Sequence, residues 1–105
     1  VPADERGYVA LAVLHINRNA PDKARPLLER ALTVNPSFAE TLYWLAVLTA
    51  PERPEEGLRL LERAVKNGFK DRKRLKENPA FAKLEGNTAY QNLLKVFGHG
   101  KATKR

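Results

Sequence analysis

The sequence contains no cysteine and only two histidines among its 105 residues. The absence of cysteine excludes disulfides, thiol catalysis and cysteine-based metal sites. No run of 18 or more apolar residues occurs, so no segment is predicted to insert into a membrane. Long polar tracts are also missing, which argues against disorder over most of the chain. The length suits one compact domain rather than two.

The chain begins with Val1 rather than methionine, and no basic segment followed by an apolar one comes after it. We interpret the sequence as a processed product or, by preference, a piece of a longer bacterial protein. Cytoplasmic and exported proteins can both lack cysteine, so the compartment is left open between these two. We expect a soluble protein in either case.

Enzymatic signals are nearly absent. His15 lies in the apolar stripe of a predicted helix, where a packed core residue is the favoured interpretation, and His99 lies between two glycines. These two histidines make no plausible metal set, and no nucleophile stands in a pattern with a base. We therefore predict a non-catalytic protein with no catalytic residue, no metal site and no cofactor.

The positive charge lies in the last third of the chain. Residues 1–65 hold 8 basic and 9 acidic residues, whereas residues 66–105 hold 11 basic and 3 acidic residues. We define the basic patch as Lys66, Lys70, Arg72, Lys73, Arg74 and Lys76. Three interpretations stay open for it: a solvated face, a site for an acidic protein surface, or a site for RNA. RNA is the least favoured, because the neighbouring aromatic residues have spacings that suit helix cores.

Two stretches of the sequence repeat each other. At an offset of 33, Pro21–Ala24 matches Pro54–Gly57, and Leu27–Leu32 matches Leu60–Val65. At an offset of 34, an upstream group of four residues matches a second group: Tyr8, Leu11, Ala12 and His15 against Leu42, Leu45, Ala46 and Thr49. The offset changes by one residue between His15 and Pro21, because the corresponding connection in the second copy is one residue shorter. Loops tolerate such a deletion.

Each copy is predicted to form two helices, because its apolar residues recur at i, i+3, i+4 and i+7. In the first copy, one helix carries Tyr8 to His15, and another starts at Pro21 and ends at Asn35-Pro36. In the second copy, a capping box of Ser37 and Glu40 is expected to open a helix that runs to about Thr49. The last helix of this copy is predicted to start at Pro54 and end at Asn67-Gly68.

Residues 69–105 follow a different pattern. We expect a short helical turn at Asp71–Lys76, a second turn capped by Asn78 with Pro79 at its first position, and a last helix capped by Asn87. The domain is predicted to cover residues 3–97, with repeats at about 5–36 and 37–68 and a capping segment at 69–97. Residues 98–105 are predicted to form a flexible basic tail.

The repeated pattern resembles the tetratricopeptide repeat (TPR), a helix–turn–helix motif with large apolar and small residues at fixed places. The residues that carry this resemblance are Tyr8, Leu11, Ala12, Ala24, Leu28, Ala31 and Pro36, then Leu42, Leu45, Ala46, Gly57, Leu61 and Ala64. The ending resembles the segment that closes bacterial arrays, at Gly68-Phe69, Leu75, Asn78-Pro79, Phe81, Leu84, Tyr90 and Leu93-Leu94. The implied fold is all-α: a short right-handed alpha-alpha superhelix of two repeats plus C-terminal capping helices.

The resemblance implies a protein-binding or scaffolding role, with a concave groove lined by the first helix of each repeat. The expected partner-binding residues are Arg6, Val9, Val13, Tyr43, Trp44 and Val47, with Tyr43 or Trp44 as the main anchor. Because Val9 and Val13 replace the polar residues of a carboxylate clamp, we expect an apolar peptide or helix as the ligand. Two alternatives stay open: a homodimer, or coverage of the groove by the chain's own C-terminal helices.

Overall fold

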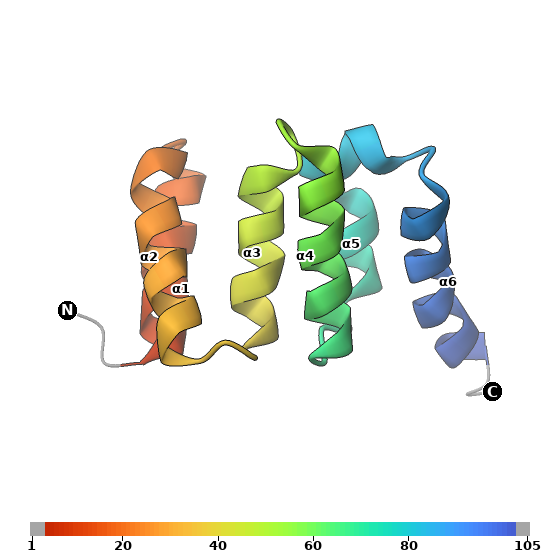
Figure 1. Ribbon diagram of the computed structural model, residues 1–105, viewed down its shortest axis with the longest axis horizontal. Helices are drawn as coiled ribbons and strands as arrows, with labels where there is room; N and C mark the ends of the chain where they lie inside the picture. The colour runs from red at the N-terminus through yellow and green to blue at the C-terminus, as the bar shows by residue number, and fades with distance from the viewer. Residues whose placement is uncertain (1–3, 103–105) are drawn as a thin grey trace.

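The computed structural model describes residues 4–102, with side chains for residues 4–96. Within this range the chain is all-helical and contains no strand. Figure 1 shows the elements in chain order from one end of the molecule to the other. These elements are α1 (Glu5–Asn17), α2 (Pro21–Val34), α3 (Ala39–Thr49), α4 (Pro54–Lys66), α5 (Arg72–Glu77), η1 (Pro79–Leu84) and α6 (Thr88–Ala102).

The two predicted repeats are two helix pairs. Helix α1 packs along α2, and α3 packs along α4, while α3 also contacts α1 and α2 and so joins the pairs. In Figure 1, α2 and α4 lie toward the viewer, whereas α1 and α5 lie behind them. The predicted helical repeat architecture is confirmed.

The ends of α1 and α4 show why the chain turns where the sequence predicts. Gly68 follows α4 with φ 106°, and the Phe69 amide donates to the Ala64 carbonyl at 2.9 Å. Asn19 follows α1 with φ 61°, and the Ala20 amide donates to the His15 carbonyl at 2.8 Å. Both are left-handed C-terminal caps, which glycine and asparagine adopt more readily than other residues.

The predicted capping box at Ser37 and Glu40 is wrong. The Asn35 side chain accepts the Ser37 amide at 3.1 Å, so Ser37 belongs to a turn, and α3 begins only at Ala39 without a side-chain cap. The Glu40 carboxylate is instead bonded to Arg74 and Trp44. A tertiary partner therefore replaces the local one that the sequence pattern suggested.

Small residues let the helices of each repeat approach closely. Ala12, Ala24 and Ala31 are fully buried in one apolar cluster with Tyr8 and Leu28. The corresponding Gly57 of the second repeat lies so close to Ala50 that a Cβ atom on it would stand 2.6 Å from the Ala50 Cβ and 2.7 Å from its Cα. No real Cβ atom is accommodated at such a distance without backbone movement.

Gly57→Ala is therefore expected to destabilise the fold by about 1–3 kcal/mol, because the clash involves backbone rather than a flexible side chain. Gly86→Ala is the matched control, since nothing lies within 4 Å of a Cβ at Gly86. Urea unfolding followed by circular dichroism measures both changes. Equal stability of the two variants would contradict the close contact between α4 and the end of α3.

The C-terminal segment completes the second apolar cluster. This cluster has thirteen buried residues, and the C-terminal segment supplies six of them, namely Phe69, Leu75, Phe81, Leu84, Tyr90 and Leu94. Asn78 and Asn87 are helix caps as predicted, since they accept the amides of Ala80 and Tyr90. Asp71 caps α5 by accepting the Arg74 amide. The caps fix where each of these helices begins, and the apolar side chains of the helices pack in the same cluster as those of α3 and α4.

Helix α6 runs five residues further than predicted, to Ala102. Residues 98–102 were predicted to belong to the flexible tail, but they continue the helix, and a glycine inside a helix costs only about 1 kcal/mol relative to alanine. The rest of the predicted tail, residues 103–105, lies outside the described residues. The domain boundaries at residues 3 and 97 stay a prediction.

Candidate partner-binding groove

A depression at the α1 end of the molecule contains several of the predicted partner-binding residues. We define the apolar groove as a depression of about 390 Å³ lined by Arg6, Val9, Ala10, Val13, Phe38, Glu40, Trp44 and Arg74. Four of the six predicted partner-binding residues lie in it. Ala10 and Arg6 are exposed, Val13 and Trp44 are half-buried, and Val9 is buried and lies at the floor.

Tyr43 does not lie in this groove, and its expected role as an exposed anchor is wrong. The Tyr43 side chain is 1% exposed, because residues of the C-terminal segment cover it. Its ring stacks on Phe69 with centroids 4.6 Å apart and meets Phe81 edge-on at 5.9 Å. Val47 is half-buried and packs against the same cluster, outside the lining of the groove. The alternative in which the chain's own C-terminal helices cover the predicted site is therefore correct for Tyr43.

Hydrogen bonds fix Tyr43 in this buried position. Its hydroxyl donates to the Arg74 carbonyl at 3.2 Å and accepts from the Asn78 amide group at 2.9 Å. These bonds satisfy a phenol that burial would otherwise leave without partners. Tyr43 thus links α3 to α5 and to Asn78, the residue between α5 and η1.

Arg74 closes one end of the apolar groove. Its guanidinium makes two parallel bonds to the Glu40 carboxylate, at 2.8 and 2.9 Å. The same group lies over three rings, with 4.5 Å to the Tyr43 centroid, 5.3 Å to Phe69 and 5.5 Å to Trp44. A planar guanidinium satisfies a carboxylate and aromatic faces together, which a lysine does not.

Trp44 takes its orientation from the same carboxylate. The indole Nε1 donates to Glu40 at 3.2 Å, and the ring meets Tyr43 edge-on with centroids 5.1 Å apart. Trp44 is the single tryptophan of the chain. Its fluorescence therefore comes from one position, which lines the apolar groove and also a hollow beside Tyr43 and Asn78.

The hydroxyl groups of two tyrosines titrate abnormally. Burial raises the pKa of Tyr43 above its ordinary value of 10.0, although the Asn78 hydrogen bond and the Arg74 charge oppose the change. Burial also raises the pKa of Tyr90, whose hydroxyl donates to the Leu75 carbonyl at 3.0 Å. The hydrogen bonds that Arg74 donates to Glu40 raise the pKa of Arg74 and keep it charged. All three groups therefore hold their protons more tightly in the folded chain.

A raised tyrosine pKa makes stability depend on alkaline pH. Below about pH 10 the phenol is protonated in both the folded and the unfolded state. Above this pH the unfolded chain loses the proton first, which lowers the free energy of unfolding. We expect the native protein to be about 1–2 kcal/mol more stable than Tyr43→Phe below pH 10, because the variant loses two hydrogen bonds. This advantage should shrink above pH 10, as urea titrations at several pH values would show. An advantage that grows with pH would contradict the burial of Tyr43.

Only part of the basic patch is exposed to solvent. Lys66, Lys70, Lys73 and Lys76 are exposed. Arg72, in contrast, donates from Nε to the Leu94 carbonyl at 3.2 Å, and Arg74 is bonded to Glu40. Arg72 thus joins α5 to α6 within the C-terminal segment, whereas Arg74 binds this segment to α3.

The aromatic residues near the patch lie in the core. Phe69, Phe81 and Tyr90 are 4%, 1% and 1% exposed, so their rings present no face to a base. The side chain of Phe97 lies outside the described residues. Stacking on aromatic rings is the main contact by which proteins hold single-stranded RNA. The burial of these rings weighs against the RNA interpretation of the patch.

A second depression adjoins the apolar groove. We define the basic depression as a hollow of about 850 Å³ between the start of α3 and the chain from Asn67 to Arg74. Its lining includes Lys70, Arg72 and Lys73, and it shares three residues with the apolar groove, namely Phe38, Glu40 and Arg74. The two depressions therefore meet at the Glu40–Arg74 ion pair.

Among the residues that the structure describes, no group of three histidine, aspartate or glutamate residues is arranged to hold a metal ion. His15 is half-buried on α1. Over the same residues, no helix has both the length and the apolar character needed to cross a membrane.

Comparison with known proteins gives one match. A tetratricopeptide repeat family model covers residues 5–48, which hold α1, α2 and nearly all of α3. Residues 5–48 are thus similar to tetratricopeptide repeats, and the chain folds as a TPR-like helical repeat. Searches of curated proteins and of solved structures each gave no match. Repeats of this family generally mediate protein–protein interaction and form scaffolds without catalytic activity.

Proposed function

We propose that the chain is a non-catalytic protein-interaction module that binds an apolar peptide or helix of another protein in the apolar groove. The observation that carries this proposal is the groove itself, lined by Val9, Ala10, Val13, Phe38 and Trp44. Repeats of this family generally bind proteins, and the groove lies on the first helices of both repeats. An apolar lining favours an apolar anchor over a charged chain end.

Trp44 replaces Tyr43 as the main anchor in this proposal. It is half-buried, and its ring is fixed by the bond to Glu40. A ring that is already ordered loses little conformational freedom on binding, and aromatic side chains dominate binding energies at protein interfaces. We therefore expect the ligand's apolar side chains to contact Trp44 and the α1 face at Ala10 and Val13.

A homodimer is the alternative occupant. The same apolar residues could contact those of a second copy, and light scattering after size exclusion distinguishes a dimer from a monomer. A dimer that Ala10→Glu dissociates would replace the peptide proposal. A monomer leaves the groove available to a different protein.

Binding is tested with peptides selected from a random twelve-residue display library on the immobilised chain. Ala10→Glu should weaken the binding of enriched peptides at least about tenfold, because a charge would be desolvated against an apolar ligand. Ala10 is exposed, so circular dichroism should not change. Ala82→Glu in η1, another exposed alanine, is the matched control and should bind normally. Failure of the library to yield binders, or unchanged binding by Ala10→Glu, would contradict the proposed site.

A further inference from the structure

The basic depression holds charges that the fold does not use. Four basic residues line it within five positions, namely Lys70, Arg72, Lys73 and Arg74, against the two carboxylates of Glu40 and Asp71. Glu40 is engaged by Arg74, and Asp71 accepts the Arg74 amide at 3.1 Å. Among the ion pairs of residues 4–102, none includes Lys70 or Lys73, and both side chains are exposed. The depression therefore carries a surplus of uncompensated positive charge.

This charge lies directly beside the apolar groove. Phe38, Glu40 and Arg74 line both depressions, so a ligand that leaves the groove past Phe38 enters the basic depression. An extended peptide of about 8 residues reaches roughly 26 Å. Because the two depressions share these three lining residues, a peptide of this length can contact both.

We propose that the protein recognises peptides in which an apolar segment is followed or preceded by acidic residues, whose carboxylates lie against Lys70 and Lys73. This inference rests on the proposed function, because the apolar segment of the ligand occupies the apolar groove. Lysines on flexible stems suit carboxylates in varied positions, and charge complementarity at the rim of a site selects among apolar ligands. The buried rings of Phe69 and Phe81 make an acidic peptide the better match than RNA.

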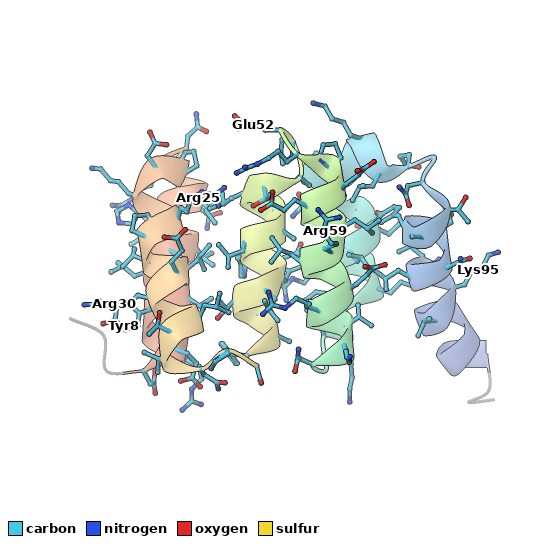
Figure 2. The ribbon with its side chains drawn as sticks, viewed as in Figure 1. Tyr8, Arg25, Arg30, Glu52, Arg59 and Lys95 are labelled. Carbon is cyan, nitrogen blue, oxygen red and sulfur yellow. The ribbon has the colours of Figure 1, made fainter. Side chains whose placement is uncertain are left out.

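The same display library tests the proposal when it is selected on two proteins. Peptides enriched on the native chain should combine apolar residues with Asp or Glu. The double variant Lys70→Glu/Lys73→Glu should instead enrich Lys and Arg beside a similar apolar segment. The matched control Lys23→Glu/Arg30→Glu alters two exposed cations of α2 and should select the same acidic peptides as the native chain. Figure 2 places Arg30 at the α1–α2 end of the molecule, opposite to Lys95 on α6.

Affinity measurements with one enriched acidic peptide give the quantitative result. The Lys70→Glu/Lys73→Glu variant should bind it at least about tenfold more weakly at low salt, and added salt should narrow the difference because it screens exposed charges. Enriched peptides without an acidic excess would overturn this inference and leave the apolar groove intact as a site. Unchanged peptide binding by Ala10→Glu would overturn the proposed function as well. Displacement of the peptide by a single-stranded RNA, with a loss of RNA binding in the double variant, would overturn the choice of an acidic peptide.

Discussion

Removal of residues 69–105 is expected to abolish cooperative folding of the remaining chain. The segment supplies six buried side chains to the cluster that covers α3 and α4. Burial of a large apolar side chain contributes about 1.5–3 kcal/mol, so six contribute roughly 9–18 kcal/mol. A whole domain is stable by only about 5–15 kcal/mol. The truncated chain would also expose Tyr43 and Leu61, which favours aggregation.

Three measurements on residues 1–68 check this expectation. Circular dichroism should show reduced helicity, urea unfolding should lose its sigmoidal shape, and size exclusion should show aggregates. A monomer of residues 1–68 that unfolds cooperatively, with the denaturation midpoint of the full chain, would contradict the capping role of the C-terminal segment. Two repeats would then be sufficient by themselves.

Tyr43→Ala is expected to destabilise the protein by about 3–5 kcal/mol, the range for aromatic-to-alanine changes in a core. The ring stacks on Phe69 and lies under the Arg74 guanidinium, so its loss leaves a cavity at the centre of the second cluster. Tyr43→Phe is the matched control: it keeps the ring, loses only the bonds to Arg74 and Asn78, and should cost about 1–2 kcal/mol.

Chemical denaturation of both variants separates the two contributions. A Tyr43→Ala chain as stable as the native protein would mean that the ring is exposed in solution and that the C-terminal segment does not cover it. Equal losses in the two variants would mean that the hydrogen bonds, rather than the packing of the ring, hold the segment in place.

The repeat itself could be predicted from the sequence, because its signals are local. Pro21 and Pro54 start α2 and α4, Asn19 and Gly68 follow the ends of α1 and α4, and the apolar stripes have helical spacing. Each of these signals acts within a few residues, so no knowledge of tertiary contacts is needed. The one wrong cap, at Ser37, failed because Asn35 competes for the same amide.

The site could be predicted only in part, because long-range contacts decide which groove positions are free. Val9, Val13 and Trp44 line the groove as the sequence suggested. Tyr43 occupies the position on α3 that Val9 occupies on α1. Arg74 and Asn78, which lie 31 and 35 residues further along the chain, bind Tyr43. The run of basic residues at 70–76 contained no sign that Arg74 binds Glu40 rather than facing solvent. Pairing across such a separation leaves no periodic trace in one sequence.

The fluorescence of Trp44 tests the central claim most directly, since the chain contains one tryptophan and that residue lines the apolar groove. A library-selected peptide without tryptophan is titrated into the protein while the emission spectrum and acrylamide quenching are recorded. A ligand in the groove should shift the emission to shorter wavelength and reduce quenching, with the same midpoint as binding measured by calorimetry. An emission spectrum and a quenching constant that stay unchanged at saturation would show that the peptide binds elsewhere, and the account of the groove would be wrong.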